Sequence, residues 1–459
     1  MSLIIIGGGI SGLSLAYSLV SGKGDIELTL IEADRKLGGK VCSQTERGYI
    51  FESGVNAFLN NKPKTLELAS HLLLHPLRSS DSARKRFIYS EGKLHRLSES
   101  PPAFLASSLM SLPGKLRILL EPFMPKGAKD DESLADFARR RLGKEAYEKL
   151  IDPMASGIYA GDPETMSLKS CFPRIYELEN EYGSLIRALI KLKKEAKKTG
   201  AKVSAGPSGV LTSFPSGMSS MTDALGAVLK HRIKTQSKAV SIEKTKQGYA
   251  VYLEDGSRLE AERIVLATPA YESANILKEM DKSFSDALEE IPYPPLSIVA
   301  LAYKKEKLKA SLDAFGFLVP KKEGRRILGA LYDSSIFPNR APEGYVLLRC
   351  MAGGAKSPEI ALMDDKRLLS SVLEDLRDIS GIRTEPELIK IFRHEKAIPQ
   401  YLIGHSERLR KIDEILQRYK GLYITGNSLR GIGFNDCIEN SYKLSERILQ
   451  PVTSESHLR

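Results

Sequence analysis

Apolar residues at the start of the chain form two short runs, separated by a glycine turn and an amphipathic stretch. Residues 3–6 (LIII) and 27–31 (ELTLI) are largely apolar, and residues 7–9 are three glycines. Between the two runs, residues 11–20 (SGLSLAYSLV) repeat apolar side chains at helical spacing. Short apolar runs bounded by glycine are typical of buried strands, whereas the middle stretch is typical of a helix. The chain is therefore predicted to begin with a βαβ unit.

The pattern changes several times further along the chain. Residues 98–202 have a mainly helical pattern. Residues 238–269 alternate apolar and polar side chains around Gly248 and a turn at 255–256, which predicts a β-meander. Residues 296–352 then have a strand pattern, residues 364–379 a helical pattern, and residues 421–427 the pattern of a buried strand.

One stretch inside the helical region fits neither period. Residues 156–185 (SGIYAGDPETMSLKSCFPRIYELENEYGSL) contain glycines and prolines that break any long helix, and they lack the alternation of a strand. They also carry Tyr159, Phe172 and Tyr176, which a disordered linker does not need. We expect a compact, irregular and partly apolar segment here. The small, polar stretch at 201–215 is expected to be a domain boundary.

The composition is that of an ordinary globular protein with two or three domains. Of its 459 residues, 42% are hydrophobic and 27% are charged. The four cysteines lie far apart without a CxxC pair, which argues against a disulfide scaffold and fits a reducing compartment. His71 and His75 lack the Glu of a zinc-binding HExxH helix, so no metal site is predicted.

The apolar run at residues 3–20 is not expected to be a signal peptide or a membrane span. No basic segment precedes it, and four glycines and three serines interrupt it. A cytoplasmic location is therefore expected.

The net charge of +11 is partly local. Residues 187–202 hold seven basic residues against one Glu, and residues 137–144 (FARRRLGK) form a second cluster. Solvated helix faces explain both clusters, and attraction to anionic lipid headgroups is the alternative. Nucleic acid is disfavoured, because no aromatic interleaving accompanies the charge.

The first glycine turn has the pattern of a dinucleotide-binding site. Gly7, Gly9 and Gly12 make a GxGxxG motif between the predicted strand and helix. Such glycines let the main chain approach a pyrophosphate, whose charge lies at the helix N-terminus. Glu32 ends the next strand, twenty residues after Gly12, where its carboxylate can accept both ribose hydroxyls of an adenosine. That carboxylate would repel a ribose phosphate, so NADP is disfavoured.

A second glycine turn near the C-terminus favours FAD over NAD. Gly426, Gly431 and Gly433 lie between a predicted strand and a final helix. The isoalloxazine end of FAD lies far from the adenosine and needs its own close backbone approach. NAD folds usually complete their site within one continuous N-terminal domain. A simple loop is the alternative for these C-terminal glycines.

Together these pieces resemble the oxygen-dependent protoporphyrinogen oxidases, with the bacterial coproporphyrinogen oxidases as siblings. The resemblance covers nearly the whole chain and rests on GGGISGL, EADRKLGGKV, YIFESGVNAFL, KRFIYSEGKL, SGIYAGDPETMSLKSCFP, FGFLVP, IPQYLIGH and GNSLRGIGFNDCI. Of these, SGIYAGD is the most specific, because broader amine-oxidase and carotene-desaturase relatives lack it.

The resemblance implies an α/β fold with α+β insertions, built on a Rossmann-like FAD-binding domain of the monoamine-oxidase and protoporphyrinogen-oxidase type. It also implies a mixed-sheet substrate domain and a helical insertion. The expected boundaries are 1–85, 205–285 and 400–450 for the FAD domain, 86–204 for the helical domain, 286–399 for the substrate domain and 451–459 for a tail.

The resemblance also implies which residues bind FAD. Adenosine and pyrophosphate contacts fall on Gly7, Gly8, Gly9, Ile10, Ser11, Gly12, Glu32, Ala33, Gly39, Lys40 and Val240. Contacts to the flavin end fall on Gly54, Val55, Asn56, Ala57, Gly426, Ile432, Gly433 and Phe434.

Substrate contacts are implied in the same way. Arg86 matches the arginine that pairs with a substrate propionate, and Gly157 matches the glycine whose carbonyl faces a pyrrole nitrogen. The expected apolar clamp and the orienting amide are Phe315, Leu318, Leu331, Met351 and Asn56. Without the family, the apolar residues would be interpreted as core and Arg86 as one of many surface arginines.

The implied activity is FAD-dependent oxidation of protoporphyrinogen IX to protoporphyrin IX, a late step of haem biosynthesis. Molecular oxygen is the expected acceptor, with release of hydrogen peroxide. Coproporphyrinogen III oxidation is the nearest alternative. The others are a different flavin amine oxidase or polyene desaturase, and a non-catalytic tetrapyrrole-binding flavoprotein. The chain has no Trp, whereas amine oxidases typically carry an aromatic pair near the flavin.

Residues 101–125 (PPAFLASSLMSLPGKLRILLEPFMP) belong to the helical domain that rests on the membrane in this family. Peripheral contact with the inner face of the cytoplasmic membrane is one expectation, and a buried helix pair is the other. A monomer or a homodimer is expected.

Overall fold

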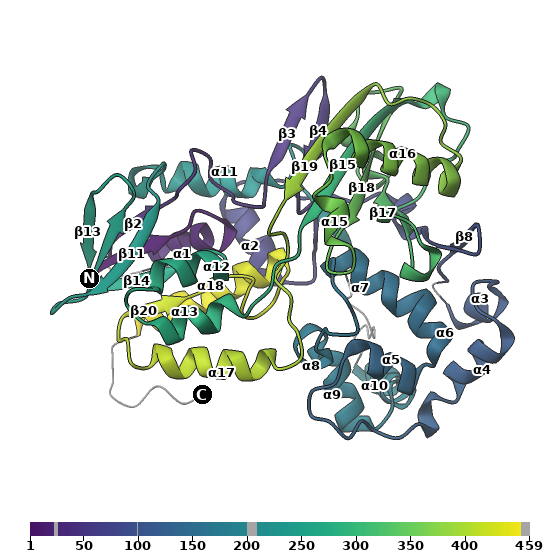
Figure 1. Ribbon diagram of the computed structural model, residues 1–459, viewed down its shortest axis with the longest axis horizontal. Helices are drawn as coiled ribbons and strands as arrows, with labels where there is room; N and C mark the ends of the chain where they lie inside the picture. Colours follow the sequence, from purple (N-terminus) through teal and green to yellow (C-terminus); the bar gives the residue numbers. More distant parts are fainter. Residues whose placement is uncertain (23–25, 99, 200–208, 451–459) are drawn as a thin grey trace.

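Five parallel strands bring segments from both ends of the chain into one sheet. The computed structural model describes residues 1–22, 26–98, 100–199 and 209–450 (Figure 1). The strand order is β10-β2-β1-β14-β20, and each neighbouring pair is parallel. The strands are β1 (Ser2–Ile6), β2 (Glu27–Ile31), β10 (Ile233–Lys234), β14 (Arg263–Leu266) and β20 (Leu422–Ile424). The strands predicted at 3–6, 27–31 and 421–427 are therefore confirmed within a few residues.

Both faces of this sheet are covered, because successive side chains of a strand point to opposite sides. Leu3 and Ile5 pack against three helices, and Ile4 and Ile6 pack against three others and a small antiparallel sheet. The first group is α1 (Ile10–Ser21), α11 (Ser219–Val228) and α18 (Phe434–Leu449). The second is α12 (Ala270–Leu277), α13 (Lys282–Glu289), α17 (His405–Leu416), β11 (Ala239–Lys244), β12 (Tyr249–Leu253) and β13 (Arg258–Ala261). The predicted meander at 238–269 is thus confirmed as β11 to β14, of which β14 joins the parallel sheet.

A second, mixed sheet of seven strands stands beside the first (Figure 1). Its order is β19-β15-β18-β17-β16-β7-β8. One face packs under α16 (Asp365–Ser380), so the opposite face is left for other segments. The strands are β7 (Arg86–Ser90), β8 (Lys93–Arg96), β15 (Leu296–Lys304), β16 (Gly316–Leu318), β17 (Ile327–Leu331), β18 (Tyr345–Gly353) and β19 (Leu388–His394).

The structure corrects one part of the expected helical domain. Residues 86–96 are not helical, because β7 and β8 form a hairpin at the edge of the mixed sheet. Glu91 and Gly92 have φ angles of 53° and 78°, the conformation of a two-residue hairpin turn. β7 pairs in parallel with β16, far along the chain, so this edge is stabilised by a contact that a local pattern does not contain.

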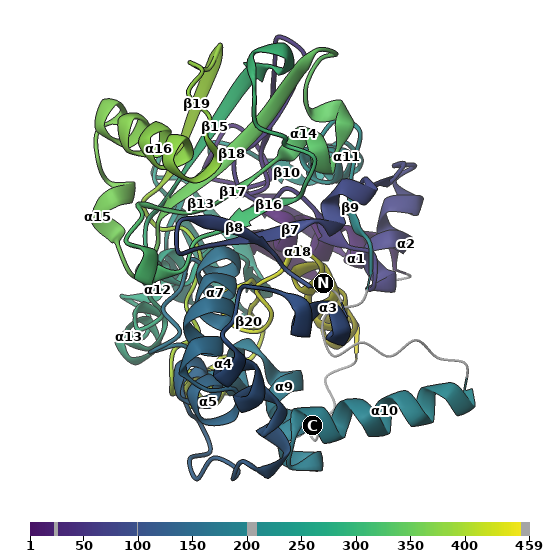
Figure 2. The same ribbon diagram turned by 90° about the vertical axis from the view of Figure 1, so that its right-hand side faces the viewer.

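The helical segment fills the space below the mixed sheet (Figures 1 and 2). The expectation that residues 156–185 are irregular is wrong for much of the stretch. Residues 156–159 form the end of α7, which stops at Ala160 with φ 49°, and residues 168–171 and 173–182 form two further helices. The helices are α3 (Pro101–Ala106), α4 (Leu112–Leu119), α5 (Leu134–Arg141), α6 (Lys144–Ala146), α7 (Asp152–Tyr159), α8 (Leu168–Cys171), α9 (Pro173–Tyr182) and α10 (Leu185–Thr199). Among the described helices, none combines the length and the apolar character needed to cross a bilayer.

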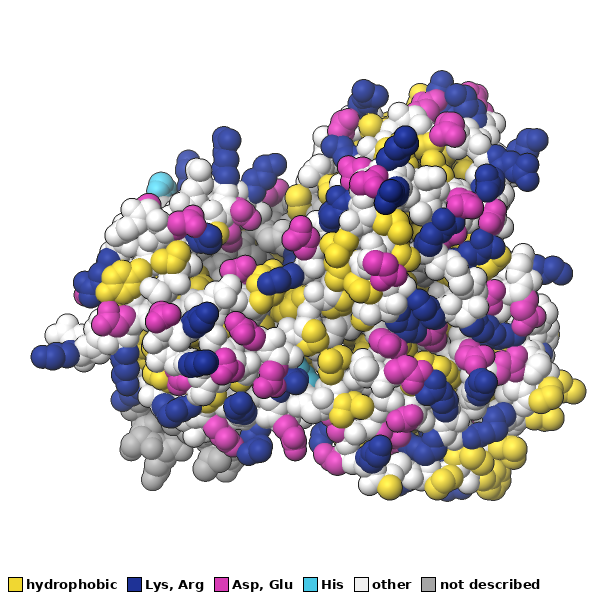
Figure 3. Space-filling model, in the orientation of Figure 1, with side chains coloured by type: hydrophobic (Ala, Val, Ile, Leu, Met, Phe, Trp, Pro, Cys, Tyr) yellow, Lys and Arg dark blue, Asp and Glu magenta, His cyan; other side chains and the backbone are white. Residues whose placement is uncertain are grey.

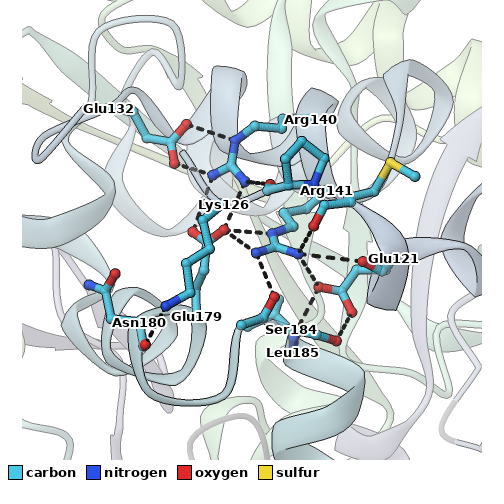
Figure 4. Close-up of polar contacts among 12 residues, drawn as sticks. Glu121, Lys126, Glu132, Arg140, Arg141, Glu179, Asn180, Ser184 and Leu185 are labelled. Carbon is cyan, nitrogen blue, oxygen red and sulfur yellow. Dashed lines mark hydrogen bonds and ion pairs between the residues drawn. The ribbon is translucent and has the colours of Figure 1, made fainter. Parts of the chain in front are cut away.

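A buried polar network joins these helices (Figure 4). Arg141 and Glu121 are fully buried, and the Nη1 atom of Arg141 lies 3.3 Å from Oε1 of Glu121. Arg141 Nε donates to Glu179 at 2.6 Å, and Arg140 pairs with the same carboxylate. The expectation that 137–144 is a solvated basic face is therefore wrong for Arg141, because acidic partners distant in sequence enclose it.

Two of the expected boundaries stay predictions. The tail at 451–459 and most of the boundary at 201–215 lie outside the described residues. Short strands and helices complete the fold: β3 (Ser43–Glu46), β4 (Tyr49–Glu52), β5 (Phe58–Leu59), α2 (Pro63–His71), β6 (Leu77–Arg78), β9 (Leu211–Ser213), α14 (Asp333–Ile336) and α15 (Pro358–Ala361).

Candidate cofactor and substrate site

The turn between β1 and α1 is too tight for side chains at two of its glycines. An added Cβ at Gly12 would lie 1.9 Å from the carbonyl oxygen of Gly7, and one at Gly7 would lie 2.8 Å from that of Ala267. By contrast, a Cβ at Gly9 would meet no atom within 4 Å. Gly9 caps α1, so its main chain borders open space at the positive end of the helix dipole. This arrangement fits a pyrophosphate.

Glu32 lies directly beneath the same turn. Its Oε2 accepts a hydrogen bond from Gly8 N at 2.6 Å, and its Oε1 accepts one from Asp34 N at 2.9 Å. A cavity of about 500 Å³ begins at the next residue, Ala33, and extends to the loop before β11. Val240, in β11, is 42% exposed. Gly8, Glu32 and Ala33, all predicted for the adenosine end, thus lie together at the carboxyl edge of the parallel sheet, where nucleotides bind in such folds.

The C-terminal glycine turn, residues 426–433, begins near this edge. It follows β20, and Gly426 and Gly431 have φ angles of 132° and 78°. Gly433 then caps α18, which lies side by side with α1, because Ser441 Oγ donates to Ser11 O at 2.8 Å. The two glycine turns therefore open at neighbouring helix N-termini, as one extended cofactor requires.

A third loop, residues 53–57, lies between the two sheets. A Cβ added to Gly54 would lie 2.6 Å from Lys40 O, which again demands glycine. The side-chain amide nitrogen of Asn56 is buried and has no hydrogen-bond partner within the described ranges. A buried amide of this kind costs free energy unless a further group accepts its hydrogen bond, so a bound cofactor or substrate fits here.

The ammonium of Lys40 contacts main-chain carbonyls after β19. Its ammonium donates to Lys396 O at 2.6 Å and to Ala397 O, and lies 5.2 Å from the centre of the Tyr293 ring. Burial lowers the pKa of Lys40 to about 8. The side chain therefore bridges the first glycine turn to the strand connection after β19 and does not point along the adenosine cavity.

The predicted substrate residues share one face of the mixed sheet. Strand pairing places Arg86 beside Gly316, Leu331 beside Gly316 on the other side, and Met351 beside Gly329. Because side chains alternate along a strand, Arg86, Leu318, Leu331 and Met351 all point away from the face that α16 covers. Four strands thus contribute to one wall.

Two contacts join this wall to the helical segment and to the loop at residues 53–57. A Cβ on Gly157 would lie 2.4 Å from Leu318 Cδ2, so α7 packs directly on β16. Phe315 and Leu331 pack in one cluster with Ala57, and the Arg86 guanidinium lies 4.9 Å from the centre of the Phe315 ring. Arg86 is exposed, and it makes no ion pair within the part of the chain that the structure describes.

Sequence reasoning missed the side chains that hold these loops. Arg349 donates to Glu52 O and Gly54 O at 3.2 and 3.1 Å, and His394 Nε2 donates to Ser53 O at 2.7 Å. An arginine inside the apolar run LLRCMAG was the available signal, since a buried charge needs partners.

The chain is similar to known proteins over nearly its whole length. A family model described as flavin containing amine oxidoreductase matches residues 10–449. The chloroplastic protoporphyrinogen oxidase of Oryza sativa subsp. japonica is 33% identical over 479 residues, covering 99% of this chain and 89% of that one. The coproporphyrinogen III oxidase of Bacillus subtilis (strain 168) is 30% identical over 452 residues, covering 95% of each. A crystal structure from Exiguobacterium sp. 255-15 superposes with a TM-score of 0.83 at 25% identity, covering 97% of this chain and 98% of that one.

Proposed function

The chain belongs to the flavin-containing amine oxidoreductases, in the group that includes protoporphyrinogen and coproporphyrinogen oxidases, and on that premise we propose that it oxidises protoporphyrinogen IX to protoporphyrin IX. It is an oxidoreductase that uses FAD. The observation that carries the choice of substrate is the apolar wall of Leu318, Leu331 and Met351, with the exposed guanidinium of Arg86 at its edge. A flat, largely apolar molecule with a carboxylate on one side matches that wall.

The protein contributes to this reaction mainly by orienting the substrate. In a porphyrinogen, sp³ methylene bridges isolate four pyrroles. Aromatisation takes three rounds, each of which removes a hydride from a bridge carbon together with one proton, and two of the six hydrogens lost come from pyrrole N–H groups. FAD, when bound, supplies the hydride acceptor and passes the electrons to oxygen, which leaves as hydrogen peroxide. We assign Asn56 and Gly54 to the flavin side, Arg86 to a propionate, and the carbonyl of Gly157 to a pyrrole N–H.

The far end of the wall favours protoporphyrinogen over coproporphyrinogen. Met351 packs in a cluster with Leu328, Ile398 and Leu296, all apolar. Vinyl groups suit such a surface, whereas two additional propionates would lose their hydration against it. Assaying the protein with each porphyrinogen, by the growth of porphyrin fluorescence, tests this choice. Faster turnover of coproporphyrinogen would reverse it.

Replacing Arg86 by alanine should weaken substrate binding and leave FAD bound. A charge-assisted hydrogen bond to a propionate is worth about 1.5–3 kcal/mol, so KM should rise roughly 10- to 100-fold. Steady-state kinetics and the flavin absorption of the purified variant measure the two effects separately.

Arg84→Ala is the matched control. Arg84 lies two residues earlier, is 72% exposed and, among the residues that the structure describes, forms an ion pair with Asp81 alone. Its removal should leave KM unchanged. An unchanged KM in Arg86→Ala, or loss of flavin from it, would contradict the assignment.

The exposed apolar side chains of α3, α4 and the turn that follows support membrane contact. We name this surface the apolar platform: Leu105, Leu112, Leu116, Leu119, Leu120 and Phe123. Leu112 and Phe123 are 69% and 75% exposed, and α4 has no buried residue, so the alternative of a buried helix pair is wrong for these side chains. Apolar side chains gather at the lower right of Figure 3. Clustered side chains of this kind are typical of peripheral membrane or protein contact.

Serine at Leu112, Leu116, Leu119 and Phe123 should release the protein from lipid. Each side chain contributes part of the roughly 1.5–3 kcal/mol of full burial, so partitioning onto vesicles should fall at least about 100-fold. Vesicle flotation measures it. The control carries serine at Leu73, Val228 and Leu362, which are exposed singly elsewhere. Equal partitioning of the two variants would exclude the platform as the lipid-binding surface.

A further inference from the structure

The segment 400–405 (QYLIGH) crosses between the helical segment and the C-terminal glycine turn. Two of its side chains donate to main-chain carbonyls of that turn. Tyr401 Oη donates to Asn427 O at 2.6 Å, and His405 Nε2 donates to Leu429 O at 3.0 Å. Both side chains are almost completely buried, at 3% and 1% exposure.

The two rings support each other. Their centroids are 4.1 Å apart with an interplanar angle of 12°, so they stack. Since a carbonyl can only accept, His405 carries its proton on Nε2, and its Nδ1 has no partner among the described residues. Burial lowers the pKa of His405 to about 4. The hydrogen bond to Leu429 O and the charge of Asp131 oppose this shift, whereas Arg408 and Arg430 add to it. The imidazole is therefore neutral, and it serves as a fixed donor.

The main chain of the same segment is bound to the helical segment. Ser167 N donates to Tyr401 O at 2.9 Å, and Ile403 N donates to Thr165 O at 3.0 Å. Gly404 N donates to the carboxylate of Asp131 at 2.9 Å. Ile432 of the glycine turn packs against the cluster that contains Tyr401 and Tyr159. The segment 400–405 thus has one set of partners on each side.

We propose that Tyr401 and His405 are positioning residues, which hold the C-terminal glycine turn in its FAD-binding shape and fix it relative to the helical segment. This inference rests on the proposed function only in placing the flavin at residues 431–434. The turn alone would relax, because Gly426 and Gly431 at positive φ carry little conformational restraint of their own. Two buried donors from outside therefore define the path of the turn.

Tyr401→Phe and His405→Leu should each weaken FAD binding, because each leaves a buried carbonyl without its donor. An orphaned buried acceptor costs enough to raise the FAD dissociation constant about 10-fold. His405→Gln keeps an amide N–H within reach of Leu429 O and should restore most of the affinity. Titrating the apoprotein with FAD, followed by flavin fluorescence and by the visible spectrum, measures this without turnover.

Tyr249→Phe is the matched control. Tyr249 is equally buried, and its hydroxyl donates to Lys420 O at 2.9 Å, before β20 begins. It should lower thermal stability about as much as Tyr401→Phe and leave FAD affinity unchanged. If Tyr401→Phe and His405→Leu bind FAD as tightly as the wild type, the inference is wrong, whatever the substrate. If they bind it weakly but the wild type does not oxidise porphyrinogen, the proposed function fails and the inference stands.

Discussion

Gly12→Ala is expected to abolish tight FAD binding and to lower the melting temperature. The added Cβ would lie 1.9 Å from the carbonyl oxygen and 3.1 Å from the carbonyl carbon of Gly7, both main-chain atoms. Gly7 cannot move away freely, because its own α-carbon faces Ala267 O. The turn must therefore open and move the N-terminus of α1 from the pyrophosphate. We expect FAD affinity to fall by more than about 100-fold, beyond the usual cost of overpacking. Flavin absorption of the purified protein and calorimetry measure the two effects.

Substitutions at two other glycines separate the steric clash inside the turn from the loss of FAD binding. Gly9→Ala adds a Cβ that meets no protein atom at an ordinary φ of −74°, so the apoprotein should keep its stability and still bind FAD weakly. Gly22→Ala, at the opposite end of α1, should change neither property. A Gly12→Ala protein that purifies with full flavin and an unchanged melting temperature would show that this turn does not hold the cofactor.

The glycine turns could be read from the sequence because their determinants are local. The three glycines Gly7, Gly9 and Gly12, the apolar runs that flank them and the acidic Glu32 all lie within about one βαβ unit. Five residues of β1 and β2 pair in the register that this unit demands. Local pattern and tertiary structure agree there, as expected where each level of a fold supports the others.

Contacts between distant segments could not be read in this way. The hairpin of β7 and β8 is completed by β16, more than two hundred residues later, so its neighbours in sequence indicated helix. The same is true of Arg349 on the loop at 53–57 and of Tyr401 on the C-terminal turn. Nothing in the local pattern states which carbonyl a buried donor will meet. The resemblance named residues that we expect beside the cofactor, and it omitted the side chains that hold these loops in place.

The buried polar network of the helical segment is the clearest example of contacts between distant segments. Its disruption is expected to have the second large effect. Arg141→Met should destabilise the segment by about 3–5 kcal/mol, the usual cost of removing one partner from a buried ionic network. Glu121 and Glu179 would stay buried with fewer hydrogen bonds. Burial opposes ionisation of Glu179, but hydrogen bonds from Arg140 and Arg141 hold the pKa of that carboxyl below its usual range. Thermal unfolding and limited proteolysis of the helical segment measure the loss.

Arg139→Met provides the comparison on the same helix. Arg139 is 40% exposed and pairs with Glu164 at the surface, so its loss should cost at most about 1 kcal/mol. The network also lies beneath the apolar platform. Glu121 directly follows Leu120 of the platform and accepts hydrogen bonds from Leu185 N and Ile186 N. Arg117 of α4 donates to Arg140 O and Arg141 O. Arg141→Met should therefore lose vesicle binding before it loses FAD, because the residues proposed to bind FAD lie on other segments. Equal stability of the two methionine variants would mean that the buried charges are not what holds the platform in place.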